Sequence, residues 1–260
     1  SWATTYYPLQ QYGLKLKFLD VELDTLNIDI SKLEEALTPK TKMIIAVSIL
    51  GNPCSLDVIR KFCDDNGLYL FEDNCESMGA ELNGKFCGTF GDIGTFSTFF
   101  SHHISTMEGG IILTENEETF HLMKSLRAHG WTRDLPYDSS ICDRGEDDFY
   151  EAYRFILPGY NARPLDLSGA IGIEQLKKLD SMIAIRRKNA EVFVSLFSKD
   201  DRFIIQKENG KSSWFSFTIV LNPKYAIDRS SVMEAMRTAE IEFRLITGGC
   251  FLRHDVIKYF

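Results

Sequence analysis

Segments of strand length alternate with segments of helix length in the first third of the chain, and this alternation constrains the fold more than any other feature. The apolar patterns predict strands at 15–22, 42–48 and 68–73, separated by helices at 30–37 and 56–66. A strand, a helix and a further strand in that order form the unit from which parallel sheets are assembled. The sequence therefore predicts an α/β fold with a mainly parallel sheet.

The rest of the chain predicts further helices and a small second unit. A helix is expected at 117–128, with Thr114 and Glu117 in the spacing of a capping box. The polar, acidic stretch 130–160 is interpreted as a functional loop, with plain disorder as the alternative. Apolar residues at helical spacing then predict a long helix over 166–197. The final elements predict a small α+β unit, with a strand at 212–221, a helix at 230–239 and a strand at 241–246.

Composition and charge exclude several classes of protein. With 260 residues, of which 44% are hydrophobic and 25% charged, the chain can bury a core and is neither fibrous nor disordered. A net charge of −8 excludes a general nucleic-acid surface but not a local site for an anionic nucleotide. No apolar run is long enough to span a bilayer and no signal peptide opens the chain, so we expect a cytoplasmic protein.

The cysteines and the first residues of the chain add two expectations. The six cysteines are widely spaced and form neither a CxxC pair nor a zinc-ligand pattern, so no metal site is expected. The chain starts with SWATTYYP rather than Met, and it shows no glycine-rich phosphate loop. We therefore expect a fragment that lacks an amino-terminal part, and with it such a loop.

Three motifs in a fixed order resemble those of sugar aminotransferases. They are FEDNCES at 71–77, GDIGTFSTFFSHH at 91–103 followed by EGG at 108–110, and GYNARPLDLSGAIGIEQLKKL at 159–179. With them, the whole chain resembles the family that uses pyridoxal phosphate on the aspartate-aminotransferase (fold type I) scaffold. The resemblance implies a cofactor-binding large domain at 1–180, a small carboxy-terminal domain at 181–260, and a homodimer with shared active sites.

His102 departs from the family pattern, which has a lysine at this position. Imidazole has no primary amine that could condense with an aldehyde, and it can only accept, donate or share a proton. Histidine at this position is a feature of the family's nucleotide-sugar 3-dehydratases, which the chain therefore resembles. One kind of these enzymes holds an iron–sulfur cluster. Such a cluster normally needs four thiolates, and the stretch 125–148 offers only Cys142, so the iron-free kind is the better match. That kind acts on GDP-4-keto-6-deoxymannose in the synthesis of colitose, a sugar of lipopolysaccharide O-antigens.

The resemblance also assigns roles around a cofactor that is bound without a covalent bond to the chain. Asp73 would keep the pyridine nitrogen protonated, Ser97 would bind the phosphate, and Glu76 stands where the family has a glutamine beside the phenolic oxygen. Trp2 would stack on the ring, and Asn161 would reach the phosphate in the other subunit. From the residues alone, the alternatives are an Asp at a strand end, a surface Ser, a terminal Trp and a loop Asn before a proline.

Two adjacent histidines cannot both point at one cofactor from an extended backbone. The family pattern selects His102, and His103 is expected to pack structurally. Candidates for binding a sugar hydroxyl, a pyrophosphate or a carboxylate are His129, Arg133 and Arg244, with Arg163 and Arg253 also considered.

The implied function is that of a 3-dehydratase that works with pyridoxamine phosphate. His102 would act as general base and return its proton to the leaving C3 hydroxyl of the ketosugar. Ammonia and a 3-deoxy ketosugar would be released, and L-glutamate would restore the amine of the cofactor. Two alternatives stay open: a nucleotide-sugar aminotransferase homologue that has lost its lysine, and a binding protein for the cofactor or the nucleotide sugar that has no turnover.

Overall fold

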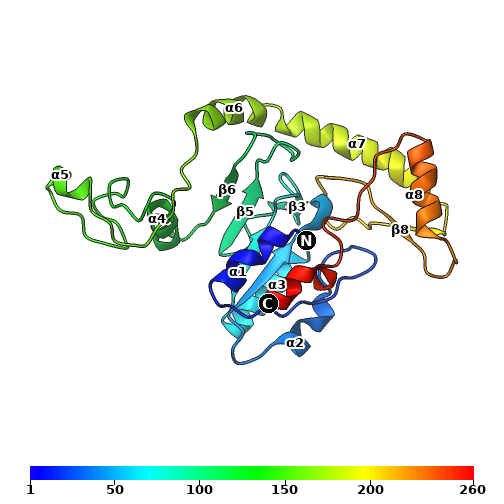
Figure 1. Cartoon of the computed structure of the whole chain (residues 1–260), viewed down its shortest axis with the longest axis horizontal. Helices are drawn as coiled ribbons and strands as arrows, with labels where there is room; N and C mark the ends of the chain where they lie inside the picture. Colours follow the sequence, from blue (N-terminus) through cyan, green and yellow to red (C-terminus); the bar gives the residue numbers. More distant parts are fainter.

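The computed structural model describes all 260 residues and has a four-stranded sheet at its centre (Figure 1). The strands lie in the order β1 (Met43–Val47), β2 (Tyr69–Asp73), β5 (Ile93–Ser97) and β6 (Gly110–Leu113). The first three are parallel, and β6 runs antiparallel to β5. The predicted α/β fold with a mainly parallel sheet is therefore confirmed.

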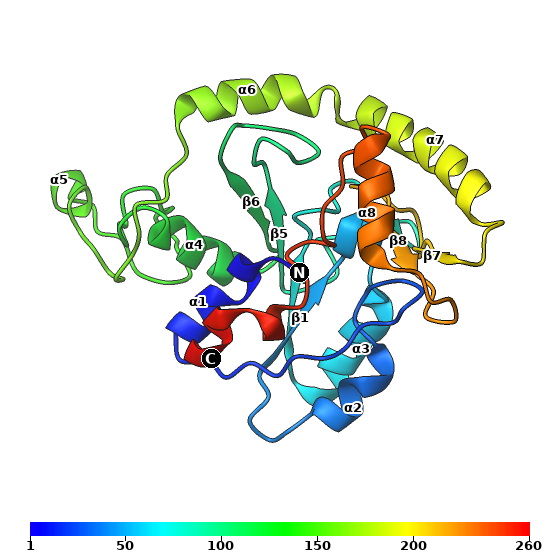
Figure 2. The same ribbon diagram turned by 45° about the vertical axis from the view of Figure 1, so that its right-hand side comes forward.

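Helix α3 (Leu56–Asn66) connects β1 to β2 and packs against both strands. Its buried side chains, Leu56, Ile59 and Cys63, recur at helical spacing and belong to the main hydrophobic core. Burial of each aliphatic side chain contributes about 1.5–3 kcal/mol relative to exposure. Gly67 ends the helix with a φ of 62°, a left-handed conformation that glycine adopts without strain. Helix α3 thus begins and ends at the residues that the sequence predicts. The short helix α2 (Leu33–Ala36) lies beside it (Figure 2).

The buried carboxylate of Glu72 fixes the loop that leads into β5. It accepts hydrogen bonds from the backbone N–H groups of Gly88 and Gly91, at 2.6 Å each, and of Phe90 at 2.7 Å. A side chain at Gly88 would collide with the ring of Phe96, because a Cβ there would lie 2.4 Å from the nearest ring atom. These contacts hold β5 against β2 and align the carboxyl ends of the two strands.

Helices that follow β6 form a lobe and an arm outside the sheet. The lobe contains α4 (Glu117–Leu126) and α5 (Asp148–Glu151), and the arm across the top of Figure 1 consists of α6 (Asp166–Leu176) and α7 (Leu179–Phe197). The helix predicted over 166–197 is therefore interrupted between Leu176 and Leu179. The predicted capping box is also wrong, because Asn116 caps α4 by accepting a 2.8 Å hydrogen bond from the N–H of Thr119.

The last third of the chain forms fewer strands than predicted. Strands β7 (Phe203–Ile205) and β8 (Ile219–Leu221) pair antiparallel, and α8 (Arg229–Thr238) follows them. The strand predicted at 241–246 is wrong, and the one predicted at 15–22 contributes only an isolated bridge from Val21 to Ile28. The domain boundary near residue 180 stays a prediction.

The two ends of the chain lie side by side (Figures 1 and 2). The ring of Phe251 contacts those of Tyr6 and Phe260, with centroids 4.7 and 5.3 Å apart, and Gln10 donates a side-chain hydrogen bond to the carbonyl of Tyr259. None of the helices combines the length and the apolar character needed to cross a membrane. The remaining elements are short: α1 (Tyr7–Gln11), a hairpin of β3 (Glu81–Leu82) and β4 (Lys85–Phe86), and 3-10 turns at Ala3–Thr5, Ile30–Lys32, Ile49–Gly51, Phe251–Arg253 and Asp255–Tyr259.

Candidate active site

Asp73 and Ser97 lie where two adjacent parallel strands end. Asp73 is the last residue of β2 and pairs in register with Thr95 of β5, so the carboxyl ends of both strands meet at one edge of the sheet. The buried carboxylate of Asp73 accepts hydrogen bonds from the Thr5 hydroxyl at 2.7 Å and from the N–H of Cys75 at 3.2 Å. Each carboxylate oxygen keeps a free lone pair, so Asp73 can accept a further hydrogen bond from a ligand.

A tight turn after β5 brings His102 next to this edge. The N–H of Phe99 donates to the Ser97 hydroxyl at 3.2 Å, and the carbonyl of Phe99 accepts from the N–H of His102 at 2.9 Å. The imidazole is partly buried, and its Nδ1 has no hydrogen-bond partner. Burial lowers the pKa of His102, and the charge of Asp73 opposes this effect in part. The imidazole is therefore neutral near pH 7 and can accept a proton.

His103 has a structural role, as expected. It is buried, and its Nε2 lies 3.2 Å from the carbonyl oxygen of Ser213. A carbonyl oxygen only accepts hydrogen bonds, so Nε2 carries the hydrogen in this pair. Burial lowers the pKa of His103 to about 4, which keeps the ring neutral. His103 thus anchors the turn through its imidazole, whereas the imidazole of His102 makes no hydrogen bond.

Glu76 lies in the loop that follows β2. Its Oε2 accepts a 2.8 Å hydrogen bond from the N–H of Leu50, a residue held at a φ of 56°. Burial raises the pKa of the Glu76 carboxyl, and the nearby charge of Asp73 raises it further. A carboxyl with a raised pKa holds a proton more readily and can then donate a hydrogen bond to an anionic oxygen.

Trp2 lies on the strand-end side of the molecule, three residues before Thr5, whose hydroxyl contacts Asp73. Its side chain is 61% exposed and lines a small hollow with Gly248, Phe251 and other residues from the end of the chain. An accessible indole face can stack on a flat aromatic ligand, although the hollow that Trp2 lines contains none of Asp73, Glu76, Ser97 and His102.

His129, Arg133 and Asn161 form a separate group in the lobe around α4. The rings of His129 and Trp131 have centroids 4.8 Å apart, and the Arg133 guanidinium lies 4.1 Å from the centroid of the Trp131 ring. Asn161 pairs with Ala128 in an isolated bridge. Sequence reasoning missed Trp131, although its place between His129 and Arg133 is a signal for a cation-binding aromatic face.

Arg163 joins the lobe group, whereas the other two arginines considered do not. Its guanidinium lies 5.6 Å from the centroid of the Trp131 ring and donates weakly to Asn161 Oδ1 at 3.4 Å. Arg244 and Arg253 are exposed, and neither makes a side-chain hydrogen bond or an ion pair. The structure therefore gathers His129 and two of the arginines considered around one indole.

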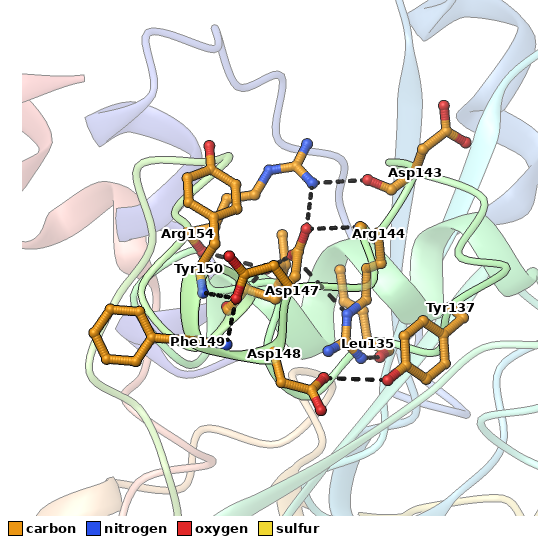
Figure 3. Close-up of polar contacts among 12 residues, drawn as sticks. Leu135, Tyr137, Asp143, Arg144, Asp147, Asp148, Phe149, Tyr150 and Arg154 are labelled. Carbon is orange, nitrogen blue, oxygen red and sulfur yellow. Dashed lines mark hydrogen bonds and ion pairs between the residues drawn. The ribbon is translucent and has the colours of Figure 1, made fainter.

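A buried carboxylate, that of Glu151, holds the segment 130–160 together. Figure 3 shows the polar contacts of this segment, with Arg154 and Asp143 among the labelled residues. The Glu151 carboxylate accepts hydrogen bonds from the Thr132 hydroxyl at 2.6 Å, the N–H of Gly145 at 2.8 Å and Arg154 Nη1 at 2.9 Å. Arg154 Nη1 also donates to the carbonyl of Asp143 at 2.7 Å. Sequence reasoning missed Glu151, because nothing in a run of acidic residues marks which one is buried. In the structure the segment is a loop with its own polar core around Glu151.

The side chains at the strand edge fit a phosphorylated pyridine cofactor. A carboxylate can pair with a protonated ring nitrogen, and a hydroxyl beside the N–H groups after β5 can bind a phosphate. His102 provides an imidazole, which can accept a proton, without an amine that could bind the cofactor covalently. No group of three or more His, Cys, Asp or Glu side chains is arranged to hold a metal ion.

Comparison with known proteins gives matches over nearly the whole chain. Residues 1–256 match the model of the DegT/DnrJ/EryC1/StrS aminotransferase family. GDP-4-keto-6-deoxy-D-mannose 3-dehydratase of Escherichia coli O55:H7 is 52% identical over all of this chain, which spans 68% of that protein. The protein of the same name from Yersinia pseudotuberculosis is 53% identical, and the chain spans 67% of it.

Two crystal structures share the fold with a TM-score of 0.97 and 52% identity, and each is covered to 68% by this chain. One is a histidine-to-asparagine mutant of GDP-4-keto-6-deoxymannose-3-dehydratase with bound GDP-perosamine. The other is the same enzyme with a trapped geminal diamine of pyridoxal phosphate and glutamate.

Proposed function

The chain belongs to the DegT/DnrJ/EryC1/StrS aminotransferase family, and we propose that it is a nucleotide-sugar 3-dehydratase. Its substrate is GDP-4-keto-6-deoxymannose, from which it removes the C3 hydroxyl, and L-glutamate regenerates the amine of its pyridoxamine phosphate. One observation carries the proposal: a neutral imidazole, that of His102, stands at the strand edge beside Asp73 where an aminotransferase needs a lysine amine. The relatives that are about 52% identical carry the name of this activity.

Four side chains would hold the cofactor, which supplies an amine for condensation with the ketone and a ring that accepts electrons. Asp73 would accept a hydrogen bond from the protonated ring nitrogen, and the Ser97 hydroxyl would bind the phosphate. Glu76, whose pKa is raised by burial, would donate a hydrogen bond to the phenolic oxygen when it is protonated. Trp2 covers one face of the ring.

His102 moves the proton in the proposed reaction. As a neutral base it takes a proton from the carbon that bears the amine of the cofactor, and as imidazolium it protonates the C3 oxygen as that group leaves. Because His102 forms no covalent bond, the cofactor stays free to exchange between its amine and aldehyde forms. The same imidazole serves the half-reaction with glutamate.

The lobe around Trp131 is proposed to serve the nucleotide sugar and a second subunit. His129 and Arg133 offer an imidazole and a guanidinium to the hydroxyl and phosphate oxygens of the substrate. Asn161 reaches the phosphate of the cofactor in the neighbouring subunit of a homodimer. Exposed aromatic side chains support an interface there: Phe149 (80%), Tyr153 (67%), Tyr150 (60%), Phe155 (55%) and Tyr160 (51%). Arg244, although exposed and unpaired, stays a prediction as a substrate ligand, and the cytoplasmic location also stays a prediction.

The decisive experiment is an incubation with pyridoxamine phosphate, GDP-4-keto-6-deoxymannose and L-glutamate. The proposal predicts a GDP-linked sugar that has lost the C3 oxygen, detected by mass spectrometry, with ammonia released as glutamate is consumed. An amino group transferred to the sugar with the C3 oxygen retained would instead identify an aminotransferase. Binding of both ligands without any product would identify a non-catalytic protein.

A further inference from the structure

The imidazole of His102 is oriented by packing rather than by hydrogen bonds. Its Nδ1 is buried and unpartnered, and its one hydrogen bond in the turn uses the backbone N–H. Two aromatic rings contact it: that of Phe99, with centroids 6.0 Å apart, and that of Phe215, 5.2 Å apart. Phe99 belongs to the same turn, whereas Phe215 comes from a distant part of the chain. The ring of Phe215 therefore sets which way the imidazole faces independently of the turn.

Helix α7 holds the segment that carries Phe215. Nη1 of Arg186 donates to the carbonyls of Trp214 at 3.1 Å and Phe215 at 2.9 Å. The next residue of the helix, Arg187, donates from Nε to the carbonyl of Ser212 at 2.9 Å. Both guanidinium groups thus donate hydrogen bonds to backbone carbonyls of one short segment, 212–215. Such charge-assisted bonds are worth more than neutral ones, so the segment is firmly placed.

The opposite side of the segment 212–215 is held by the turn after β1. The N–H of Ser213 donates to the carbonyl of Gly51, and the N–H of Phe215 donates to that of Leu50, each at 2.9 Å. Gly51 has a φ of 90°, and a Cβ there would lie 2.7 Å from the nitrogen of Trp214, so only glycine permits this approach. Leu50 also donates its N–H to Glu76, so one residue contacts both a cofactor ligand and the support of His102.

We propose that Phe215 is a positioning residue for the proposed reaction, which aims the His102 imidazole at the reacting carbon and keeps water from it. His103 supports this arrangement from the other side, since its ring lies 5.6 Å from that of Phe215 and its Nε2 bonds to Ser213. The inference depends on the proposed function for its kinetic consequences but not for the packing itself. A misaligned base costs rate without weakening substrate binding, because only the transition state requires the alignment.

The charged and titratable groups around His102 come from several elements. Asp73 at the end of β2 raises its pKa, and the neutral His103 follows it in the turn. The Glu76 carboxylate accepts a hydrogen bond from the N–H of Leu50 in the turn after β1. Arg186 of α7 donates a hydrogen bond to the carbonyl of Phe215. Phe215 adds no charge to this set. Its ring acts on His102 only by excluding water and by contact.

The test compares Phe215→Leu with the matched control Phe217→Leu. Phe217 lies two residues further on and stacks on Phe193 of α7, with centroids 4.9 Å apart. It also contacts the ring of Trp214 at 6.2 Å, but it has no ring contact with His102. We expect Phe215→Leu to lower kcat of dehydration by roughly 10- to 100-fold with KM for the nucleotide sugar nearly unchanged, as for a displaced catalytic group. Phe217→Leu should keep the wild-type kcat, and Phe215→Tyr, which retains the ring, should restore most of it.

A second measurement does not depend on turnover. In an NMR titration of the histidine rings, Phe215→Leu should raise the pKa of His102 toward its ordinary value, because the imidazole becomes hydrated, and Phe217→Leu should not. An unchanged kcat and an unchanged titration in Phe215→Leu would overturn the inference. If that variant does not fold, Arg186→Gln, which frees the segment but keeps the ring, must lower kcat instead. Absence of dehydration by the wild type would refute the proposed function, while the titration would still decide the role of Phe215.

Discussion

The side chain of His102 is a base whose strength depends on two opposing effects. Burial lowers its pKa and the Asp73 carboxylate raises it, with burial the larger effect. Protonation of His102 should therefore abolish activity only below the ordinary histidine value of about 6.5, which places the acidic limb of the rate profile below that pH. Replacing Asp73 by Asn removes the effect that raises the pKa, so the His102 titration followed by NMR should move to lower pH. Asp138→Asn, in the distant lobe, should leave it in place, and an upward shift in Asp73→Asn would contradict this account.

The identity of residue 102 decides whether the cofactor is held covalently. His102→Lys introduces a primary amine, so we expect the protein to gain the mass of the cofactor after borohydride reduction. Loss of the imidazole should lower dehydration by about 100-fold or more, the usual contribution of a general base. His102→Asn serves as control, since it should lose dehydration without gaining covalent cofactor. Dehydration at the wild-type rate in either variant would show that another group is the base.

Some residues of the candidate site could be predicted from the sequence, whereas others to which the structure points could not. His102 stands out because it interrupts a motif whose neighbours, among them Asp73 and Ser97, are intact. Phe215 and Glu151 give no such signal, because what distinguishes them is a contact with residues far along the chain or a burial that composition does not show. The sequence also placed His103 in a structural role, and its buried bond to Ser213 confirms that interpretation.

At the scale of elements, local pattern predicted the helices better than the strands. Helix α3 carries its own periodic apolar face and a glycine stop, and it forms where predicted. The segments 15–22 and 241–246 have apolar strand-like sequences but no neighbour with which to form a ladder, and they stay irregular. A strand is stabilised by hydrogen bonds and side-chain contacts with a neighbouring strand, and the sequence of one segment does not show whether such a neighbour is present.

The loop that contains Glu151 should lose stability in acid. Hydrogen bonds from the Thr132 hydroxyl, the Gly145 N–H and Arg154, together with the charge of Arg154, lower the pKa of Glu151 to about 2. Because this pKa is depressed, the stabilisation is fully present above the unfolded-state value of about 4.3 and is lost as the pH falls toward 2. Glu151→Gln should lower the urea midpoint of unfolding at pH 7, and the midpoint of this variant should then decrease less as the pH is lowered. Glu146→Gln, at an exposed neighbouring position, should change neither the midpoint nor its dependence on pH. Hydrogen exchange of residues 130–160 would locate the effect, and an unaltered exchange rate in Glu151→Gln would refute it.

The whole molecule leaves large apolar faces uncovered. Only 46 of its 260 residues are buried, α6 buries no side chain, and Leu165 at its start is 71% exposed. The antiparallel strand β6 is also open, with Ile112 54% exposed. Apolar patches of this kind mark surfaces that other polypeptide covers. The lobe combines such a surface, its exposed aromatic rings, with the candidate ligands around Trp131.

A shared site can be tested by mixing two inactive variants. In the proposed homodimer, the site of one subunit uses its own His102 and Asn161 from the neighbour. A mixed dimer of His102→Asn and Asn161→Ala then holds one site with both changes and one site with neither. If subunits are denatured and refolded together, about half of the dimers are mixed, so activity should recover to about a quarter of the wild-type level. Each variant refolded alone serves as a control for residual activity. Light scattering measures whether the refolded protein has the mass of a dimer. No recovery in a mixture that does form mixed dimers would show that Asn161 acts in the site of its own subunit.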